Sequence, residues 1–253
     1  MRAMYLGIMV CVGVGLVLAP AARADWKEGM PYKMHYPQLP DPEGWDVRAT
    51  PPLILADDFL CTQTGPITDV HFWGSFENDL VGPIANIHLS IHDNDLTGLF
   101  SKPGKTLWQG DFGPNDFIIR PWDSGPQGWL DPTQPNPIWP DHQGIWQINI
   151  PRIREPFVQQ EGNIYWLDLQ VVSLDSRFGW KTSGSRHFMD DAVWGLVPAG
   201  GPGPGPEPIA WEPLTDPRTG ASLDMAFVIT PEPATLCLLG AGVVGLLARR
   251  RRK

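Results

Sequence analysis

Cysteine is scarce in this sequence, and its scarcity limits how the protein is stabilised. Only three cysteines occur in 253 residues, and Cys61 alone lies between residues 25 and 230. One cysteine cannot form an internal disulfide, so this central body must be stabilised by the burial of apolar side chains. A body of about 200 residues is long enough to build one such core.

Cations are also scarce in the body. Residues 25–230 contain 27 acidic and 12 basic side chains, a net charge of −15, whereas the whole chain carries −9 because seven cations lie in its two ends. A body this acidic repels phosphate groups, so we exclude nucleic acid as a partner.

Helical periodicity and the common catalytic motifs are missing as well. No body segment of twelve or more residues places apolar side chains at helical spacing. The body has no P-loop, no dinucleotide fingerprint and no G-x-S-x-G nucleophile turn. Nothing in the sequence therefore argues for an enzyme, and we predict no catalytic residue and no residue that binds a cofactor.

Short alternating segments, separated by proline and glycine turns, occupy the body instead. Within 84–92, apolar side chains alternate with His88, Ser90 and His92, and we expect the histidines to face solvent. Other strands are expected at 53–60, 67–76, 105–112, 116–122, 144–150, 163–173, 177–183, 192–197 and 223–229. This pattern predicts an all-β fold, a single antiparallel β-sandwich or jelly-roll-like domain.

The domain is expected to span residues 51–230. Residues 25–50 have no sustained period, and we expect an extended N-terminal arm packed through Trp26, Tyr36 and Trp45. The Gly/Pro-rich segment 198–208 resembles a linker. We interpret it as a surface loop within the domain, because the one strand that follows it cannot build a second core.

The segment 121–143 is the most unusual part of the body. It holds six prolines together with Trp122, Trp129 and Trp139, and we expect it to run over the surface as a loop. Its rings lie beside Asp, Asn and Gln, a combination that suits stacking on sugar faces. The alternative is that the rings pack down and hold the loop in place.

Two acidic patterns raise further hypotheses. Asp93, Asn94 and Asp95 end an expected strand, and oxygen ligands at this spacing suit Ca²⁺, although no bidentate Glu follows as in an EF-hand. Asp and Asn are equally typical of a simple turn. A glycosidase needs two carboxylates from different strands, for example Asp168 with Asp190, but the sequence does not show such a pair converging.

The N-terminus has the pattern of a signal peptide. An apolar run from Met4 to Ala19 precedes Pro20, and the small residues Ala22 and Ala24 flank Arg23. We expect residues 1–24 to direct the chain to the Sec translocon and to be removed by signal peptidase. An uncleaved signal anchor is the alternative.

The C-terminus combines an apolar stretch with a cationic end. Residues 234–248 carry no charge, and as a helix they span about 22 Å, short against a bilayer core of about 30 Å. Five consecutive cations follow. We expect a short transmembrane helix with these cations on the cytoplasmic side and the body on the other side. A plain tail anchor is the alternative to a removable signal.

The order of these C-terminal parts resembles the PEP-CTERM sorting signal of Gram-negative bacteria that make exopolysaccharide. The tripeptide Pro231-Glu232-Pro233 precedes the apolar stretch, which ends in Arg249, Arg250, Arg251, Arg252 and Lys253. The resemblance, which covers residues 231–253, implies processing by a membrane-embedded exosortase. The chain would pass through an inner-membrane intermediate and reach the cell surface or the extracellular matrix.

The body carries a second resemblance. The segments "LADDFLC", "ITDVHFWGS", "YWLDLQ", "FGWKTS" and "MDDAVW" are similar to an uncharacterised β-rich domain of secreted bacterial proteins, which implies a shared fold and no known activity. The leading hypothesis is thus a non-catalytic surface or matrix protein near exopolysaccharide. A carbohydrate-binding module, with or without Ca²⁺, and a glycan-active hydrolase are the alternatives.

Overall fold

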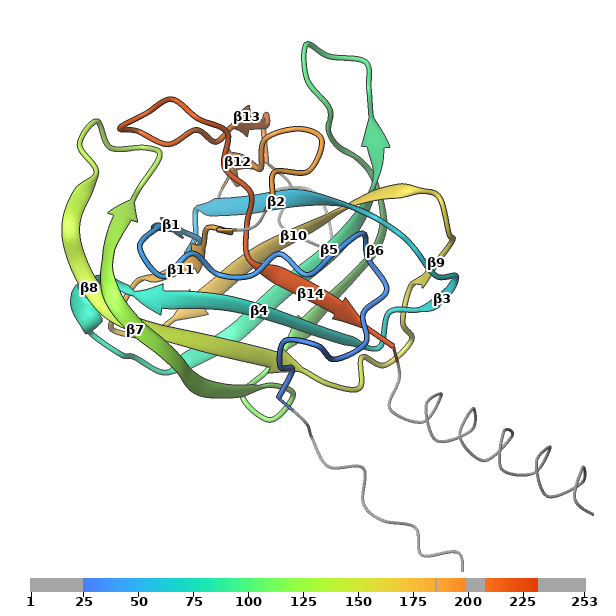
Figure 1. The fold of residues 1–253 in the computed structure, drawn as a ribbon, viewed down its shortest axis with the longest axis horizontal. Coiled ribbons are helices and arrows are strands. Elements are labelled where there is room, and N and C mark those ends of the chain that lie inside the picture. The colour runs from blue at the N-terminus through green and yellow to red at the C-terminus, as the bar shows by residue number, and fades with distance from the viewer. Residues whose placement is uncertain (1–24, 185, 199–207, 232–253) are drawn as a thin grey trace, which may run out of the picture.

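The computed structural model describes residues 25–184, 186–198 and 208–231, and these residues form an all-β structure (Figure 1). The only helical element among them is one 3₁₀ turn, η1 (Glu77–Asp79). The strands are β1 (Trp45–Arg48), β2 (Leu53–Leu60), β3 (Gly65–Pro66), β4 (Asp69–Phe76), β5 (Ile84–Asp95), β6 (Lys102–Phe112), β7 (Ile118–Leu130), β8 (Ile138–Ile150), β9 (Val158–Gln159), β10 (Ile164–Ser173), β11 (Phe178–Lys181), β12 (Val193–Leu196), β13 (Glu212–Pro213) and β14 (Phe227–Thr230).

Two six-stranded sheets pack together, which confirms the expected all-β class. The first has the order β11-β1-β7-β8-β4-β14, and β11 also pairs with β4, so that five of its strands close into a ring. One pair in this sheet, β1 with β7, is parallel, an exception to the expected antiparallel pattern.

The second sheet has the order β13-β12-β2-β10-β5-β6, and all its pairs are antiparallel. Strand β6 forms one edge of this sheet. The small β3–β9 pair lies beside the two large sheets.

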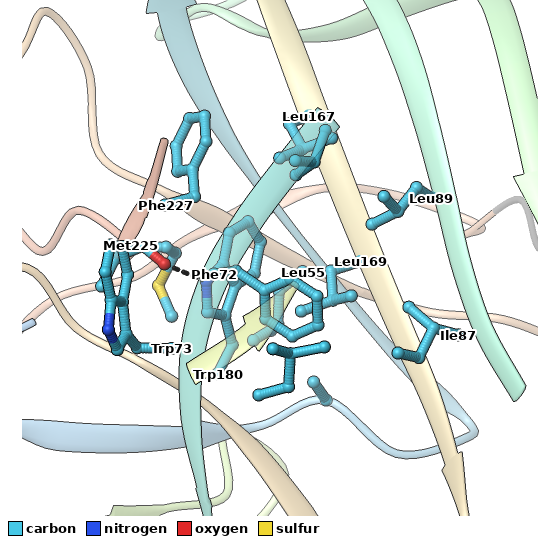
Figure 2. Close-up of a cluster of buried hydrophobic side chains, with 14 of the residues drawn as sticks. Leu55, Phe72, Trp73, Ile87, Leu89, Leu167, Leu169, Trp180, Met225 and Phe227 are labelled. Atoms are coloured by element: carbon cyan, nitrogen blue, oxygen red, sulfur yellow. Dashed lines mark hydrogen bonds between the residues drawn. The ribbon is translucent and has the colours of Figure 1, made fainter. Parts of the chain in front are cut away.

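The core lies between the two sheets (Figure 2). Phe72 and Trp180 come from the first sheet, and the second contributes a row of aliphatic side chains. Trp73, on the opposite face of β4, packs against Trp26 and Trp122. Leu89 and Leu169 are fully buried, as the alternation in their segments predicted. Burying each such side chain contributes roughly 1.5–3 kcal/mol, which supports a fold without disulfides.

The N-terminal arm is shorter than expected. It was predicted to reach residue 50, but residues 45–48 form β1, which lies between β7 and β11. Trp26 and Trp45 are buried, and Tyr36 is half-buried with its ring edge against Phe188. The arm therefore supplies a strand of the first sheet.

The segment 121–143 was expected to be a surface loop, and this expectation is wrong. Strands β7 and β8 run through it, and only residues 131–137 turn between them. The prolines suggested a loop because proline cannot donate to a ladder. The hairpin accommodates them because its register shifts between Pro121 and Asp123 and again between Ser124 and Gln127.

Candidate functional site

A surface cleft of about 350 Å³ opens at the free edge of β6. Strand β6 forms one wall, and the loop that follows β8 forms the other, so each of the two sheets supplies a side. The lining residues are Trp108, Gln109, Gly110, Asp111, Phe112, Asp116, Pro151, Arg152, Arg154 and Glu155.

An aromatic wall lines the β6 side of the cleft. Trp108, Gly110 and Phe112 share one face of the strand because side chains alternate. A β-carbon at Gly110 would lie 2.9 Å from the Trp108 ring and 3.2 Å from the Phe112 ring, so glycine makes room for both. The Trp108 indole Nε1 donates to the Glu155 carbonyl oxygen at 2.9 Å, which ties one wall to the other.

Charged groups lie on the loop wall of the cleft and on the opposite face of β6. Arg152, Arg154 and Glu155 are exposed on the loop after β8. Partial burial acts to raise the pKa of Asp111, but hydrogen bonds from Asn86 and His88 outweigh it, and the pKa falls below its usual value. Asp111 is therefore a carboxylate at neutral pH, the opposite of what a general acid requires.

This combination of groups suits binding more than catalysis. A fixed indole offers an apolar face, while guanidinium and carboxylate groups beside it donate and accept hydrogen bonds. A sugar ring presents the matching surfaces, apolar C–H faces and a rim of hydroxyls. The cleft can hold such a ring without any chemical step.

The three tryptophans singled out in the sequence do not form a common surface. Trp129 is buried, with 2% of its surface exposed, and Trp122 lies half-buried with its ring 5.3 Å from that of Trp73. Trp139 is 38% exposed, but the Arg218 guanidinium lies 4.3 Å above its ring. Only Trp139 of the three retains an exposed ring, and that ring already has a cation over it.

The proposed calcium ligands each accept a hydrogen bond from the protein. Asp93 Oδ1 accepts from the Lys105 amide at 2.6 Å, and Asn94 Oδ1 accepts from the Trp166 indole at 2.9 Å. Asp95 Oδ1 accepts from the Thr97 amide at 2.8 Å. Across the described ranges, no group of three or more His, Cys, Asp or Glu is arranged to hold a metal ion. A calcium site here stays a prediction.

His88 and His92 do not face solvent as expected. They are 4% and 1% exposed, and neighbouring strands supply their contacts: His88 Nδ1 lies 3.1 Å from Asp111 Oδ1 on β6. His92 Nε2 contacts Asp168 Oδ2 at 2.7 Å, and Ser90 contacts both residues. Asp168 Oδ1 accepts a hydrogen bond from the Ser90 amide at 2.8 Å, so both oxygens of this buried carboxylate have partners within the protein.

Asp190, the suggested partner of Asp168, is engaged elsewhere. Its Oδ2 accepts hydrogen bonds from the backbone amide and the hydroxyl of Ser101. Asp168 itself is 1% exposed, so a polymer substrate cannot reach it. In the described structure, Asp168 and Asp190 therefore do not form the accessible pair of catalytic carboxylates that the glycosidase hypothesis requires.

A buried group of carboxyls escaped the sequence reasoning. Burial raises the pKa values of Asp57 and Asp58 on β2 and of Asp224; repulsion from Asp224 raises those of Asp57 and Asp58 further, and repulsion from Asp191 raises that of Asp224. The pKa of Asp58 rises to about 8. Both Asp58 carboxyl oxygens are buried without a hydrogen-bond partner; the nearby Asp190 amide lowers the pKa without reaching bonding geometry.

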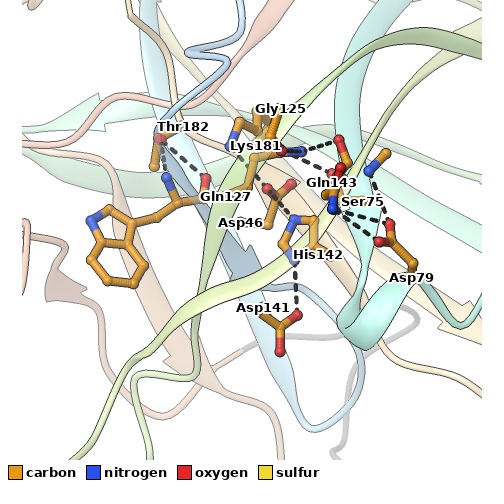
Figure 3. A network of polar contacts seen from close by, with 12 residues as sticks. Asp46, Ser75, Asp79, Gly125, Gln127, Asp141, His142, Gln143, Lys181 and Thr182 are labelled. Carbon is orange, nitrogen blue, oxygen red and sulfur yellow. Dashed lines mark hydrogen bonds and ion pairs between the residues drawn. The ribbon is translucent and has the colours of Figure 1, made fainter.

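A second buried polar group carries cations as well as carboxylates (Figure 3). Asp46 Oδ2 accepts from Lys181 Nζ at 3.0 Å and contacts His142 Nε2 at 2.9 Å, and all three side chains are fully buried. Burial acts to raise the pKa of Asp46, but Lys181 and His142 hold it below its usual value. This group, the Asp46–Lys181–His142 cluster, joins β1, β11 and β8 and is fully enclosed.

The processing residues fall mostly outside the described structure. Ala22, Ala24, Glu232, Pro233 and the arginines 249–252 are not described, whereas Pro231 directly follows β14. In the part of the chain that is described, no helix has the length and apolar character needed to cross a membrane. The expected C-terminal helix at 234–248 lies outside that part.

A two-sheet body that ends one residue before a Pro-Glu-Pro motif and a cationic tail defines an exported protein with a sorting signal. The chain belongs to the family described as a domain of unknown function, DUF7901, which matches residues 34–230. Residues 230–253 match the PEP-CTERM protein-sorting motif, which makes the chain an exosortase substrate directed to the cell surface. Neither the curated proteins nor the solved structures gave a match.

Proposed function

We propose that the body is a non-catalytic saccharide-binding module that works at the cell surface, close to exopolysaccharide. The observation that carries this proposal is the cleft at the edge of β6, where Trp108 is fixed by the Glu155 carbonyl beside Phe112. The half-buried Trp108 indole supplies stacking, with the buried Phe112 behind it, and the charged loop supplies hydrogen bonds to hydroxyl groups.

The ligand class follows from charge. A body with a net charge of −15 repels polyanions over a long range, so a neutral polysaccharide is the favoured ligand. Arg152 and Arg154 then act as hydrogen-bond donors to hydroxyls.

The route to the surface is proposed from the two ends of the chain. Residues 1–24 direct export through the Sec translocon and are removed by signal peptidase, which leaves Asp25 as the first residue. Residues 234–248 then hold an inner-membrane intermediate until exosortase acts near the Pro-Glu-Pro motif. Intact-mass analysis of the surface form tests both ends, and retention of the Arg cluster would indicate a plain anchor.

The binding site is tested by variants of the secreted, processed protein. Trp108→Ala should weaken binding to a neutral polysaccharide roughly tenfold or more, equivalent to about 1.4 kcal/mol. Trp139→Ala is the matched control, since this exposed ring lies away from the cleft, and it should change affinity less than about twofold.

The readout is affinity electrophoresis against a panel of neutral and acidic polysaccharides, with and without EDTA. Circular dichroism confirms that each variant is folded. An equal loss in both variants, or binding to none of the polymers including that of the host, contradicts the proposal. Loss on EDTA treatment would revive the calcium-assisted alternative.

A further inference from the structure

Both ends of the described body lie on the same side of the molecule (Figure 1). A chain of side-chain contacts joins them. The Asn149 amide donates to Asp25 Oδ1 at 3.3 Å, and Asn149 Oδ1 lies 2.5 Å from His71 Nδ1. The other ring nitrogen of His71 lies 3.3 Å from the hydroxyl of Thr230. The first residue after the expected signal peptide and the last residue of β14 are thus three contacts apart.

The connection between the end of β14 and the uncharged C-terminal stretch is very short. Thr230 is the last residue of the strand, and Ala234 begins the uncharged stretch. Four peptide steps reach at most about 14 Å. The headgroup layer on each side of a bilayer is roughly 5–8 Å thick. When the uncharged stretch is in a membrane, this end of the body must therefore lie against the headgroups.

Strand β14 cannot lengthen this connection without unpairing. It is bonded to β4 on one side, and on the other side the Lys33 amide donates to the Ile229 carbonyl at 2.8 Å. Val228 and Ile229 are fully buried in the core. The strand is thus firmly held up to its last residue.

The loop wall of the cleft begins at this same end. The Arg152 backbone amide donates to Asp69 Oδ1 at 2.8 Å, and Asp69 pairs directly with Thr230. Only β4 separates β8, which leads into the cleft wall, from β14. Strands are spaced by about 4.8 Å, so the start of this wall lies roughly 10 Å from the exit of the tail.

We infer that, while the sorting tail is attached, the cleft faces the bilayer and is closed by lipid headgroups. The exposed guanidinium of Arg154, on the cleft wall, suits contact with lipid phosphates. Removal of the tail releases this end, so that only the processed form can bind polymer in the cleft. The identity of the ligand rests on the proposed function, whereas the closure rests on the position of the cleft.

The closure is tested by hydrogen exchange on two forms of the protein. One is the chain that still carries its tail, purified in nanodiscs that contain phosphatidylglycerol; the other is the processed form secreted by the host. Amides in 113–118 and 151–157 should exchange at least tenfold more slowly in the nanodisc form. Amides in the hairpin turn 131–137 should exchange equally in both.

A spacer variant separates closure from an indirect effect of the tail. Twelve Gly/Ser residues inserted between Thr230 and Pro231 add about 17–21 Å of reach and should restore fast exchange in 151–157. The same insert between Gln134 and Pro135 is the matched control and should leave the protection in place.

The outcomes distinguish the two proposals. The closure is overturned if residues 151–157 exchange equally in the two forms, or if residues 131–137 are protected in their place. It is also overturned if the full-length chain does not enter nanodiscs. Saccharide binding by both forms with similar affinity overturns it as well. If neither form binds any polysaccharide, the proposed function fails, while the exchange pattern still decides whether the cleft is covered.

Discussion

Two of the buried polar groups in the described structure differ in how their charges are balanced. In the Asp46–Lys181–His142 cluster a carboxylate has two cationic or hydrogen-bonding partners, and the pKa of Asp46 is lowered. In the Asp57–Asp58–Asp224 group, burial and repulsion between carboxylates outweigh the hydrogen bonds that these groups accept, and all three pKa values are raised. The comparison shows that burial alone does not decide the charge state; the partners decide it.

The largest effect should come from removing the buried cation of the first cluster. Lys181→Met removes one of the two partners of the buried Asp46 carboxylate, leaves it with the His142 contact, and should lower the free energy of unfolding by about 3–5 kcal/mol. Urea unfolding measures this change. Lys105→Met, at an exposed lysine on β6, is the control, and it should shift stability by less than about 0.5 kcal/mol.

The second effect is a pH dependence that belongs to Asp58. Its pKa is about 8 in the folded state and 3.8 in the unfolded state, so between these values the folded state binds the extra proton. Stability must therefore fall as pH rises through this range. Between pH 6.5 and 8 the loss from one such group reaches up to about 2 kcal/mol.

The window above pH 6.5 separates this effect from the titration of His35 and His71. Burial lowers the pKa values of His35 and His71 to about 4, so the stability they gain with rising pH is complete by about pH 6.5. His142 acts in the same direction as Asp58, because its raised pKa means that stability is lost as it deprotonates.

Asp58→Asn isolates the contribution of Asp58 from those of the other groups with raised pKa values. The variant removes the ionisable carboxyl, should be more stable than the parent at pH 8, and should have a shallower slope, which the raised pKa values of His142, Asp57 and Asp224 then set. Thermal unfolding of both chains at pH 6.5, 7.2 and 8 measures the difference. Identical slopes in parent and variant would show that Asp58 does not hold its proton.

The smallest predicted effect concerns the Asp46–Lys181–His142 cluster, in which the carboxylate is balanced by its partners. Asp141 Oδ2 lies 2.8 Å from His142 Nδ1, so Asp141 supports the raised pKa of that ring. Asp141→Asn keeps an acceptor oxygen but loses the charge. It should lower the pKa of His142 and reduce stability by about 1 kcal/mol, as followed by NMR titration and urea unfolding. An unchanged pKa would assign the rise to Asp46 alone.

Much of the fold was predictable because side-chain alternation persists in segments buried on one face. Residues 53–60 form β2 as predicted, and the predicted 163–173 is β10 to within one residue. The segment 121–143 was misjudged, since its prolines look like loop residues until the register shifts of the hairpin are known. His88 and His92 were misjudged because the sequence does not show that the outer face of β5 is covered.

The site was harder to predict than the fold. Trp108, Gly110 and Phe112 lie in a segment expected to be a strand, and the alternation of ring, glycine and ring was the one available signal. The other wall, residues 151–155, comes from the other sheet, and only the tertiary structure brings it alongside. The buried carboxyl group was missed for the same reason: Asp58 and Asp224 are 166 residues apart in the sequence.

The proposal that the cleft at the edge of β6 binds a saccharide is tested most directly by an NMR titration of the processed protein with a neutral polysaccharide fragment. The account predicts that backbone amide shifts gather at residues 108–116 and 151–155. Shifts confined to 121–143, or no shifts with any fragment of the host polymer, would contradict it.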